Sequence, residues 1–238
     1  MKKQNSYGYA RAFKENGNPS WLHGLYLHWQ KLLSEPFRGI TSDGKVTPGL
    51  FGLEDQRIPI EDIVKAANLA LDKMSSQQKD RSVYHIDSPE WRTWSNPEIL
   101  LSDKGIRPDE VTEELRTAIL QLLKASLAPE GYEKATSAMR INGFLGELVE
   151  APTVMNEFSY NFALFGVESS TTEPWGFSFY GYHLCLNAFF YKRQLVLSPW
   201  FIGAEPNLIE GGKYRGTRIL EREEILSLQL MQSLQPEI

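Results

Sequence analysis

Residues 175–202 read WGFSFYGYHLCLNAFFYKRQLVLSPWFI. This stretch is rich in aromatic residues, and its two parts, 175–190 and 194–202, contain alternating apolar positions of the kind found in β-strands. The segment 158–165 has the same character and lies a short distance upstream. Because the connections between these segments are too short to hold crossover helices, they predict an antiparallel meander and disfavour a parallel sheet.

Helical patterns precede and follow the predicted strands in the sequence. Apolar residues recur every three or four positions in several segments, which is the spacing of one buried helix face. These segments are residues 20–33, 60–74, 112–127 and 129–149, followed by 221–234 near the end of the chain. The combination predicts an α+β fold in which the antiparallel β-sheet packs against several α-helices.

The chain has 238 residues, which is enough for one large domain or two small ones. Its first residues are polar until Asn18-Pro19-Ser20, where a helix start is expected. We therefore expect residues 1–20 to be a flexible N-terminal segment and residues 21–238 to form a single α+β domain.

Composition limits the class of protein. Hydrophobic residues make up 42% and charged residues 23%, close to the averages of soluble globular chains. The formal charge of −5 provides no basic field for phosphates, so no nucleic acid is expected as a partner. No apolar run is long enough to cross a membrane, and no secretory signal begins the sequence. With a single cysteine, Cys185, the sequence indicates a cytoplasmic protein with no membrane partner.

His183 is the strongest candidate for chemistry. If residues 175–187 form one uninterrupted strand, alternation places Trp175, Phe177, Phe179, His183, Cys185 and Asn187 on one face. A half-buried imidazole on an aromatic face suits acid–base catalysis. It equally suits a structural role in which His183 and Asn187 bind loop backbone, so both interpretations stay open.

Two carboxylates next to prolines are candidates to complete a catalytic site with His183. Glu173 stands at the entrance of the strand in Thr172-Glu173-Pro174-Trp175, and Glu205 stands in the loop segment Gly203-Ala204-Glu205-Pro206. A neighbouring rigid residue fixes the direction of such a side chain, as a catalytic acid requires. The alternative is that each carboxylate binds backbone amides or an arginine.

Candidate substrate-binding residues come from other segments. Arg38 and Arg140 lie in apolar or glycine-rich contexts, where a guanidinium can bind a carboxylate of a substrate or of the protein. Trp91 and Trp94 lie between two prolines in a turn-prone loop. We expect this loop, with Trp175 and Asn187, to line an aromatic pocket for a small molecule.

The sequence motifs of the common cofactor and nucleotide sites are absent. The chain has no phosphate-binding Gly-x-x-x-x-Gly-Lys, no Gly-x-Gly-x-x-Gly, no Gly-x-Ser-x-Gly and no His-Glu-x-x-His. No cofactor is therefore expected. A divalent metal bound by His183 and carboxylates, with ligands from another chain, is a further alternative.

Several blocks resemble the DUF3500 family, a bacterial and fungal domain of unknown function. The resemblance runs from about Ser34 to the end, in the blocks EPFRGITSDG (35–44), DSPEWR (87–92), GYEK (131–134), EPWG (173–176), GYHL (181–184) and GAEP (203–206). The family's strand block commonly reads Gly-His-His-Leu. His183 matches its second histidine, whereas Tyr182 replaces the first, so a metal site built on a histidine pair would be incomplete here.

Longer members of the family continue beyond the point that corresponds to Ile238. The resemblance therefore implies one of two arrangements. Either the chain is a shortened member that assembles with another copy or a second polypeptide, or it is the first half to two-thirds of a longer or two-chain unit.

These observations lead to one main hypothesis about function and two alternatives. The main hypothesis is an enzyme that converts a small molecule, of hydrolase or lyase/isomerase type, by histidine and carboxylate acid–base chemistry in an aromatic pocket. The first alternative is a noncatalytic binding or assembly module that pairs with another chain. The second is a metal-dependent enzyme with His183 among its ligands.

Overall fold

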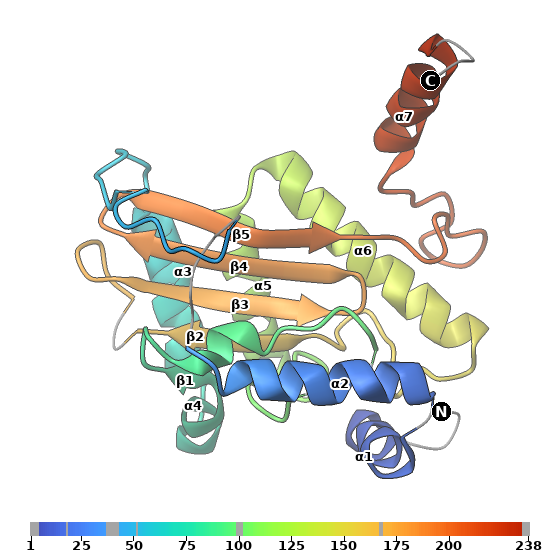
Figure 1. Cartoon of the computed structure of the whole chain (residues 1–238), viewed down its shortest axis with the longest axis horizontal. Helices are drawn as coiled ribbons and strands as arrows, with labels where there is room; N and C mark the ends of the chain where they lie inside the picture. Colours follow the sequence, from blue (N-terminus) through green and yellow to red (C-terminus); the bar gives the residue numbers. More distant parts are fainter. Residues whose placement is uncertain are drawn as a thin grey trace.

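The structure is a computed structural model that describes residues 5–17, 19–36, 43–50, 52–98, 102–166 and 169–234. Its helices are α1 (Ser6–Asn16), α2 (Ser20–Leu33), α3 (Glu61–Lys73), α4 (Ser76–Ser82), the 3₁₀ helix η1 (Pro89–Arg92), α5 (Glu113–Ser126), α6 (Pro129–Leu148) and α7 (Glu221–Ser233). Its strands are β1 (Val83–Tyr84), β2 (Asn161–Phe165), β3 (Trp175–Gly181), β4 (Leu184–Tyr191) and β5 (Gln194–Ile202) (Figure 1). The five helices expected from apolar periodicity are confirmed.

The strands form a single sheet in the order β1-β2-β3-β4-β5. Strands β2 to β5 run antiparallel to their neighbours, whereas the two-residue β1 pairs in parallel with β2. Two-residue turns at 182–183 and 192–193 connect β3, β4 and β5. The predicted α+β fold, with an antiparallel meander packed on helices, is confirmed.

The hairpin between β3 and β4 corrects the expected side-chain alternation. Gly181 pairs with Leu184, and Phe177 pairs with Ala188, so the turn reverses the parity of the two strands. Asn187 pairs with Ser178 and therefore lies on the opposite face from Phe177. The prediction that Cys185 and Asn187 share a face with Trp175 was wrong because it extended one strand through the turn.

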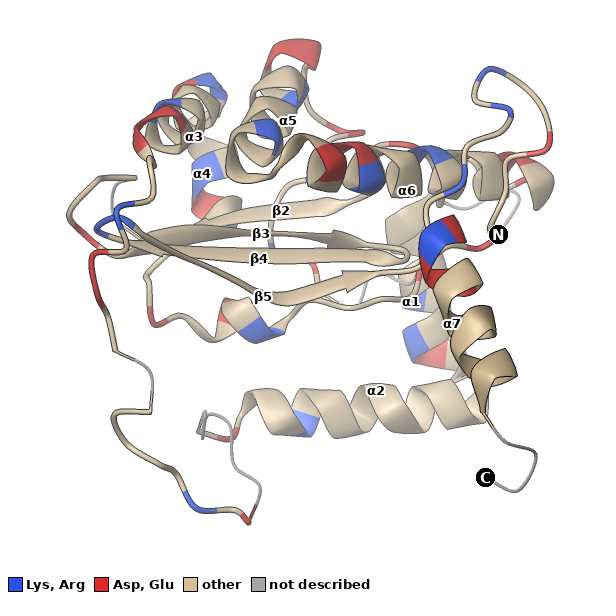
Figure 2. Ribbon diagram, turned by 90° about the horizontal axis from the view of Figure 1, so that it is seen from above, with Lys and Arg blue, Asp and Glu red and all other residues tan. Residues whose placement is uncertain are grey.

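One face of the sheet packs on α3, α5 and α6 (Figure 2). Its core is formed by large apolar side chains that are almost completely buried, among them Phe162, Trp175, Phe177, Phe179, Phe190, Ile119 and Leu122. Full burial of each such side chain contributes about 1.5–3 kcal/mol. This layer explains the apolar periodicity of the three helices, because one stripe of each contacts the sheet.

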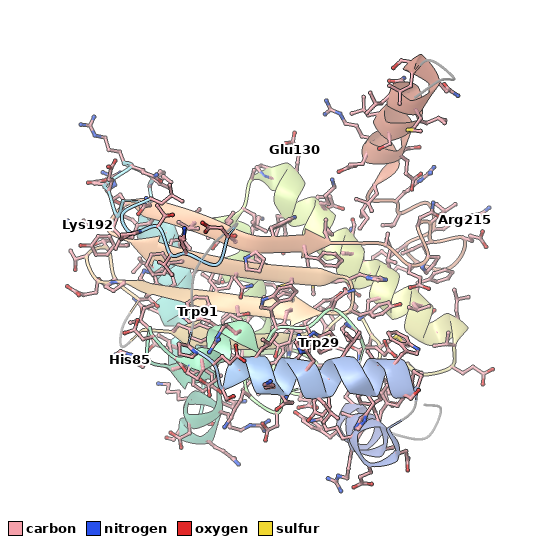
Figure 3. The ribbon with its side chains drawn as sticks, in the orientation of Figure 1. Trp29, His85, Trp91, Glu130, Lys192 and Arg215 are labelled. Atoms are coloured by element: carbon pink, nitrogen blue, oxygen red, sulfur yellow. The ribbon has the colours of Figure 1, made fainter. Side chains whose placement is uncertain are left out.

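The loop that contains η1 covers the second face of the sheet. Trp91 stacks on Phe165 with a ring-centroid distance of 3.7 Å and lies against the sheet (Figure 3). Gly176 makes this approach possible, because a Cβ atom there would lie 2.7 Å from the Trp91 ring. β3 is consequently buried on both faces, and the η1 loop is held close to the β3–β4 hairpin.

The N-terminal segment contains a helix that the sequence analysis did not predict. Residues 6–16 form α1, whose N-cap Asn5 accepts a hydrogen bond from the backbone of Gly8. Tyr9 contacts the small apolar cluster of Ala151, Val154 and Met155. The apolar pattern of α1 is weak because the helix buries few residues, so the sequence did not predict it. Its side chains contact the rest of the fold, and these contacts help to hold it in position.

Two α-helices of the described structure contribute no buried side chain. In α2 and α7, every residue is exposed or only partly buried. In Figure 2 the η1 loop lies between the sheet and α2, and α7 projects away from the body of the fold in Figure 1. Both helices are nevertheless rich in leucine, so their apolar surface remains open to solvent.

Candidate functional site

His183 lies at the tip of the β3–β4 hairpin, in the two-residue turn after Gly181. Its φ angle is +56°, in the left-handed region that residues other than glycine adopt infrequently and that Asn, Asp and His adopt more often than most. The backbone N–H of His183 donates to the side-chain oxygen Oδ1 of Asn96 at 3.1 Å, and the turn thereby joins the η1 loop.

Side chains from two different loops contact the two nitrogens of the imidazole. Nδ1 lies 3.2 Å from Asn96 Oδ1, and Nε2 lies 3.2 Å from Glu205 Oε2. Asn96 Oδ1 already accepts from the His183 backbone, so it is an acceptor for Nδ1–H as well. Nε2 is then the nitrogen that takes up or releases a proton beside the carboxylate.

Tyr182 completes the group by donating its hydroxyl to Glu205 Oε2 at 2.6 Å. This hydrogen bond, followed by the one from His183, holds the pKa of the Glu205 carboxyl below its usual value. Burial raises the pKa of the Tyr182 phenol, and the nearby charges of Glu205 and Glu98 raise it further. At neutral pH the group therefore contains an ionised carboxylate and a protonated phenol.

The segment after β5 brings Glu205 to the hairpin. Gly203 donates its backbone N–H to the carbonyl of His183 at 2.8 Å. A Cβ atom at Gly203 would lie 3.3 Å from the imidazole, so glycine allows this segment to pass close beside the ring. The sequence-predicted pair of His183 and Glu205 is thus placed in contact, with the Glu205 side chain 64% exposed and that of His183 22% exposed.

A narrow pocket lies beside Tyr182. Its volume is about 340 Å³ including the solvent at its open mouth, and its enclosed part has room for only about one water molecule. Its walls come from the η1 loop, the segment before α5, the segment after α6, the start of β2 and the β3–β4 hairpin. The residues are Ser95, Pro97, Glu98, Arg107, Val154, Met155, Ser159, Asn161, Tyr180, Gly181 and Tyr182. The pocket is therefore lined by both polar and apolar side chains.

Charge around this pocket is negative on balance. The buried guanidinium of Arg107 is paired with Asp109 at 3.0 Å and with Glu110 at 3.5 Å. Glu98 lines the pocket, and Glu205 lies on the other side of Tyr182. Because the acids outnumber Arg107, the surroundings favour a neutral or cationic ligand over an anion.

Sequence reasoning missed the contributions of Asn96, Glu98 and Tyr9. Asn96 precedes Pro97 in the loop that contains Trp91 and Trp94. An Asn-Pro pair in a turn indicates an asparagine side chain that binds backbone groups. The hydroxyl of Tyr9 donates to Glu98 Oε1 at 3.1 Å. Glu98 carries no local signal of this kind, because its partner comes from α1.

Glu173 does not join the group at His183. It lies immediately before β3, whereas His183 follows the end of that strand. Seven strand residues at about 3.3 Å each separate the two ends by roughly 20 Å. The backbone N–H of Glu173 donates to Ser170 Oγ, and the residue is exposed. The structure thus separates Glu173 from the imidazole to which the sequence interpretation assigned it.

The two arginines expected to bind substrate have different outcomes. Arg38 lies outside the described residues. Arg140 is on α6, where it pairs with Glu133 at 2.7 Å and lies over the ring of Tyr214 at 5.0 Å. That cluster belongs to the helical side of the sheet, so the structure does not bring Arg140 to the hairpin tip.

The expected aromatic pocket residues are mostly structural. Trp175 is 1% exposed, stacks on Phe190 and donates Nε1–H to the carbonyl of Ser170. Trp91 packs on the second face of the sheet, and Trp94 is partly buried in the same loop.

Asn187 is buried in β4. Its Nδ2 donates to Cys185 Sγ at 3.3 Å. Trp175 and Asn187 are therefore fixed in the sheet, on opposite faces of it, rather than at the hairpin tip.

The described ranges contain no group of three or more His, Cys, Asp or Glu side chains that could hold a metal ion. Across the same ranges, every helix is too short or too polar to cross a membrane.

A comparison with protein-family models matches residues 56–238 to the family described as "Protein of unknown function (DUF3500)". The chain belongs to the DUF3500 family. The match begins at residue 56, downstream of the resemblance suspected from Ser34, and it includes the η1 loop, the hairpin and Glu205. Searches of the curated proteins and of the solved structures found no match.

Proposed function

We propose that this DUF3500 protein is an enzyme that transfers protons on a small organic molecule at the hairpin tip. The proposal rests on one observation: both nitrogens of His183 contact side chains, Asn96 at 3.2 Å and Glu205 at 3.2 Å. General acid–base catalysis by histidine needs an imidazole whose orientation is fixed by a neighbouring group. Asn96 is such a group here, because it contacts Nδ1 of His183. Reaction classes that fit are hydrolysis and proton-transfer elimination or isomerisation.

Each residue has a distinct role in the proposal. Nε2 of His183 gives a proton to the substrate or takes one from it when the substrate replaces the exposed Glu205 carboxylate at that nitrogen, and Asn96 accepts from Nδ1–H. Glu205 stabilises the protonated ring. The phenol of Tyr182, whose pKa is raised by burial, stays protonated at neutral pH and supplies a hydrogen-bond donor beside the same carboxylate.

The charge of the site supports a neutral or cationic substrate. The sequence interpretation included an arginine that binds a substrate carboxylate, but Arg140 pairs with Glu133 on the helical side and Arg107 is neutralised by Asp109 and Glu110. A substrate anion would therefore approach Glu98 and Glu205 without a free guanidinium among the described pocket-lining residues.

The decisive test compares a His183→Asn variant with the unmodified protein in a turnover screen. The panel contains uncharged and cationic esters, lactones, amides and carbonyl compounds with acidic α-protons. Asparagine tolerates the left-handed backbone of the turn, so the fold should be preserved, and turnover should fall by about 100-fold or more. Glu205→Gln should reduce the rate by less because it leaves the base in place.

His85→Gln is the matched control, because the side chain of His85 is 69% exposed at the other end of the η1 loop. Its activity should equal that of the unmodified protein. A folded His183→Asn variant with undiminished turnover would overturn the proposal. Loss of folding in both His183→Asn and His183→Gly would support the structural role of His183 instead.

A noncatalytic assembly module is the second candidate function. It is favoured by α2 and α7, which contribute no buried residue and expose large apolar side chains. Failure of the whole substrate panel, together with a stable complex that persists in the His183→Asn variant, would favour assembly over catalysis.

A further inference from the structure

The enclosed part of the pocket beside Tyr182 is too small for an organic molecule, because it has room for only about one water molecule. A ligand can therefore enter it only if part of the wall moves. The start of β2 and the β3–β4 hairpin are held by the pairing of their strands. The walls outside the sheet include the η1 loop at Glu98 and the segment after α6, and these are the parts that can separate.

Helix α1 contacts both of these walls from outside the pocket. The hydroxyl of Tyr9 donates to Glu98 Oε1 at 3.1 Å, and its ring packs against the apolar cluster in residues 151–155. Two members of that cluster line the pocket, so a single side chain connects two walls. Ser6 adds a hydrogen bond from its Oγ to the carbonyl of Thr153 at 3.3 Å.

A second phenol of α1 reaches a third wall. Tyr7 donates to Glu110 Oε2 at 2.9 Å, and Oε1 of Glu110 lies 3.5 Å from Nε of the pocket residue Arg107. Burial and then the nearby charge of Glu98 raise the pKa of the Tyr9 phenol to about 12, so this phenol is a hydrogen-bond donor at neutral pH. Helix α1 thus holds three wall segments together by polar contacts.

The attachment of α1 to these walls is weak in comparison with the core. Two of its three buried residues, Ala10 and Phe13, pack with Leu22 and Tyr26 of α2 instead of with the main core. Helix α2 itself buries no residue. Segments with few buried apolar contacts and with partly exposed hydrogen bonds open at a lower free energy than the core. Helix α1 can therefore detach while the sheet stays folded.

We propose that α1 is a gating helix that keeps this pocket closed, and that its release opens the pocket to a small uncharged or cationic molecule. When Tyr9 leaves Glu98, the carboxylate becomes available to an N–H or ammonium donor of the ligand. Such a ligand competes with Tyr9 for Glu98 and so shifts the balance toward the open state. An anion is disfavoured, because Glu98, Asp109 and Glu110 outnumber Arg107.

The first test measures how often the pocket opens. Ser95→Cys places a thiol in the pocket wall, where Ser95 is 9% exposed. The unmodified chain, whose Cys185 is buried, measures the background. Modification by 2-aminoethyl methanethiosulfonate should become about fivefold faster with Tyr9→Phe and faster still with Tyr7→Phe/Tyr9→Phe, because each lost hydrogen bond shifts the opening equilibrium by about that factor. Tyr26→Phe is the matched control, since its ring packs on α1 and the described structure gives its hydroxyl no hydrogen bond.

A second measurement distinguishes release of α1 from general loosening of the fold. Ser126→Cys, at a position on α5 that is 6% exposed, should react slowly in every one of these backgrounds. Hydrogen exchange of the α1 amides should be faster than that of the α5 amides and should increase with Tyr9→Phe by the same factor as the modification rate. This exchange needs no introduced cysteine, so it also tests the proposal if Ser95→Cys does not fold.

A third measurement tests the charge of the ligand without a known substrate. The cationic reagent is compared with 2-sulfonatoethyl methanethiosulfonate, an anionic reagent of similar length. The ratio of the two rates at Ser95→Cys should exceed the ratio at Gln229→Cys by about tenfold. Gln229 is exposed on α7 within residues 225–233, which contain no charged residue.

Two results would overturn the gating role of α1. One is an equal modification rate of Ser95→Cys with and without Tyr7→Phe/Tyr9→Phe, and the other is protection of the α1 amides equal to that of α5. Equal ratios at positions 95 and 229 would overturn the assigned ligand charge. None of these measurements uses turnover, so a failed substrate screen beside positive results here would count against the proposed catalysis alone.

Discussion

Replacing Tyr182 by phenylalanine removes one hydroxyl and leaves the ring in place against His183, at a centroid distance of 4.1 Å. The lost interaction is the hydrogen bond to Glu205 at 2.6 Å. A buried hydrogen bond to a charged group contributes about 1.5–3 kcal/mol. Because the Glu205 side chain is 64% exposed, solvent screening reduces the expected loss to about 0.5–1 kcal/mol. For a chain of this size the melting temperature should fall by about 1–4 °C.

The pH dependence of that loss distinguishes this bond from simple packing. Tyr182 and His183 hold the pKa of the Glu205 carboxyl below its usual value. The stabilisation is therefore fully present above the unfolded carboxyl pKa of about 4.3 and is lost as the pH falls through the lower folded value. Tyr182→Phe should thus cost most at pH 7 and progressively less below about pH 4.

Urea unfolding of the native chain and Tyr182→Phe at pH 7 and pH 3 provides the measurement. Tyr191→Phe is the matched control, at the end of β4 before the turn of the next hairpin, where the described structure shows no hydrogen bond from the hydroxyl. It should change the free energy of unfolding by less than about 0.5 kcal/mol at both pH values. An equal penalty for Tyr182→Phe at pH 7 and pH 3 would refute the assigned role of Glu205.

Three further substitutions or reactions test the packing of the sheet. Gly176→Ala should destabilise the fold by about 1–3 kcal/mol in urea unfolding, because the added Cβ would lie 2.2 Å from the Ala188 carbonyl oxygen. The control Gly24→Ala should be neutral or slightly stabilising, because a Cβ there would have no atom within 4 Å. Trp91→Ala should cost about 2–4 kcal/mol and reduce the near-ultraviolet circular dichroism, and a loss below about 1 kcal/mol would contradict its stacking role. Burial raises the pKa of the Cys185 thiol to about 12, so an aromatic disulfide reagent at pH 8 should react only after unfolding, and rapid labelling of the native chain would contradict the burial.

The sheet and the main helices were predictable because their signals are local. Alternation and short connections identify a meander, and apolar periodicity identifies helices such as α5 and α6 that pack on it. The face assignment failed at Tyr182 and His183, because both fit a continuous strand in composition. Only the pairing of Gly181 with Leu184 shows that the chain turns between them.

The sequence predicted which residues could act at the candidate site but not which of them would meet. His183 and Glu205 were selected as isolated residue types, and the contact between them depends on the return of the chain after β5. Glu173 had the same local signal as Glu205, an acid before a proline, yet it lies beyond the far end of β3. Residue type indicates what a side chain can do, whereas its neighbours depend on contacts between segments that are distant in sequence.

The hydroxyls of α1 have a consequence for any shortened form of the protein. Tyr9 donates to Glu98 at 3.1 Å, and Tyr7 donates to Glu110 at 2.9 Å, so one helix supports both an acid of the pocket wall and an acid beside Arg107. The family match starts at residue 56 and does not include this helix. A truncation at residue 56 would remove both phenols. The carboxylates of Glu98 and Glu110 would then each lose one hydrogen-bond donor.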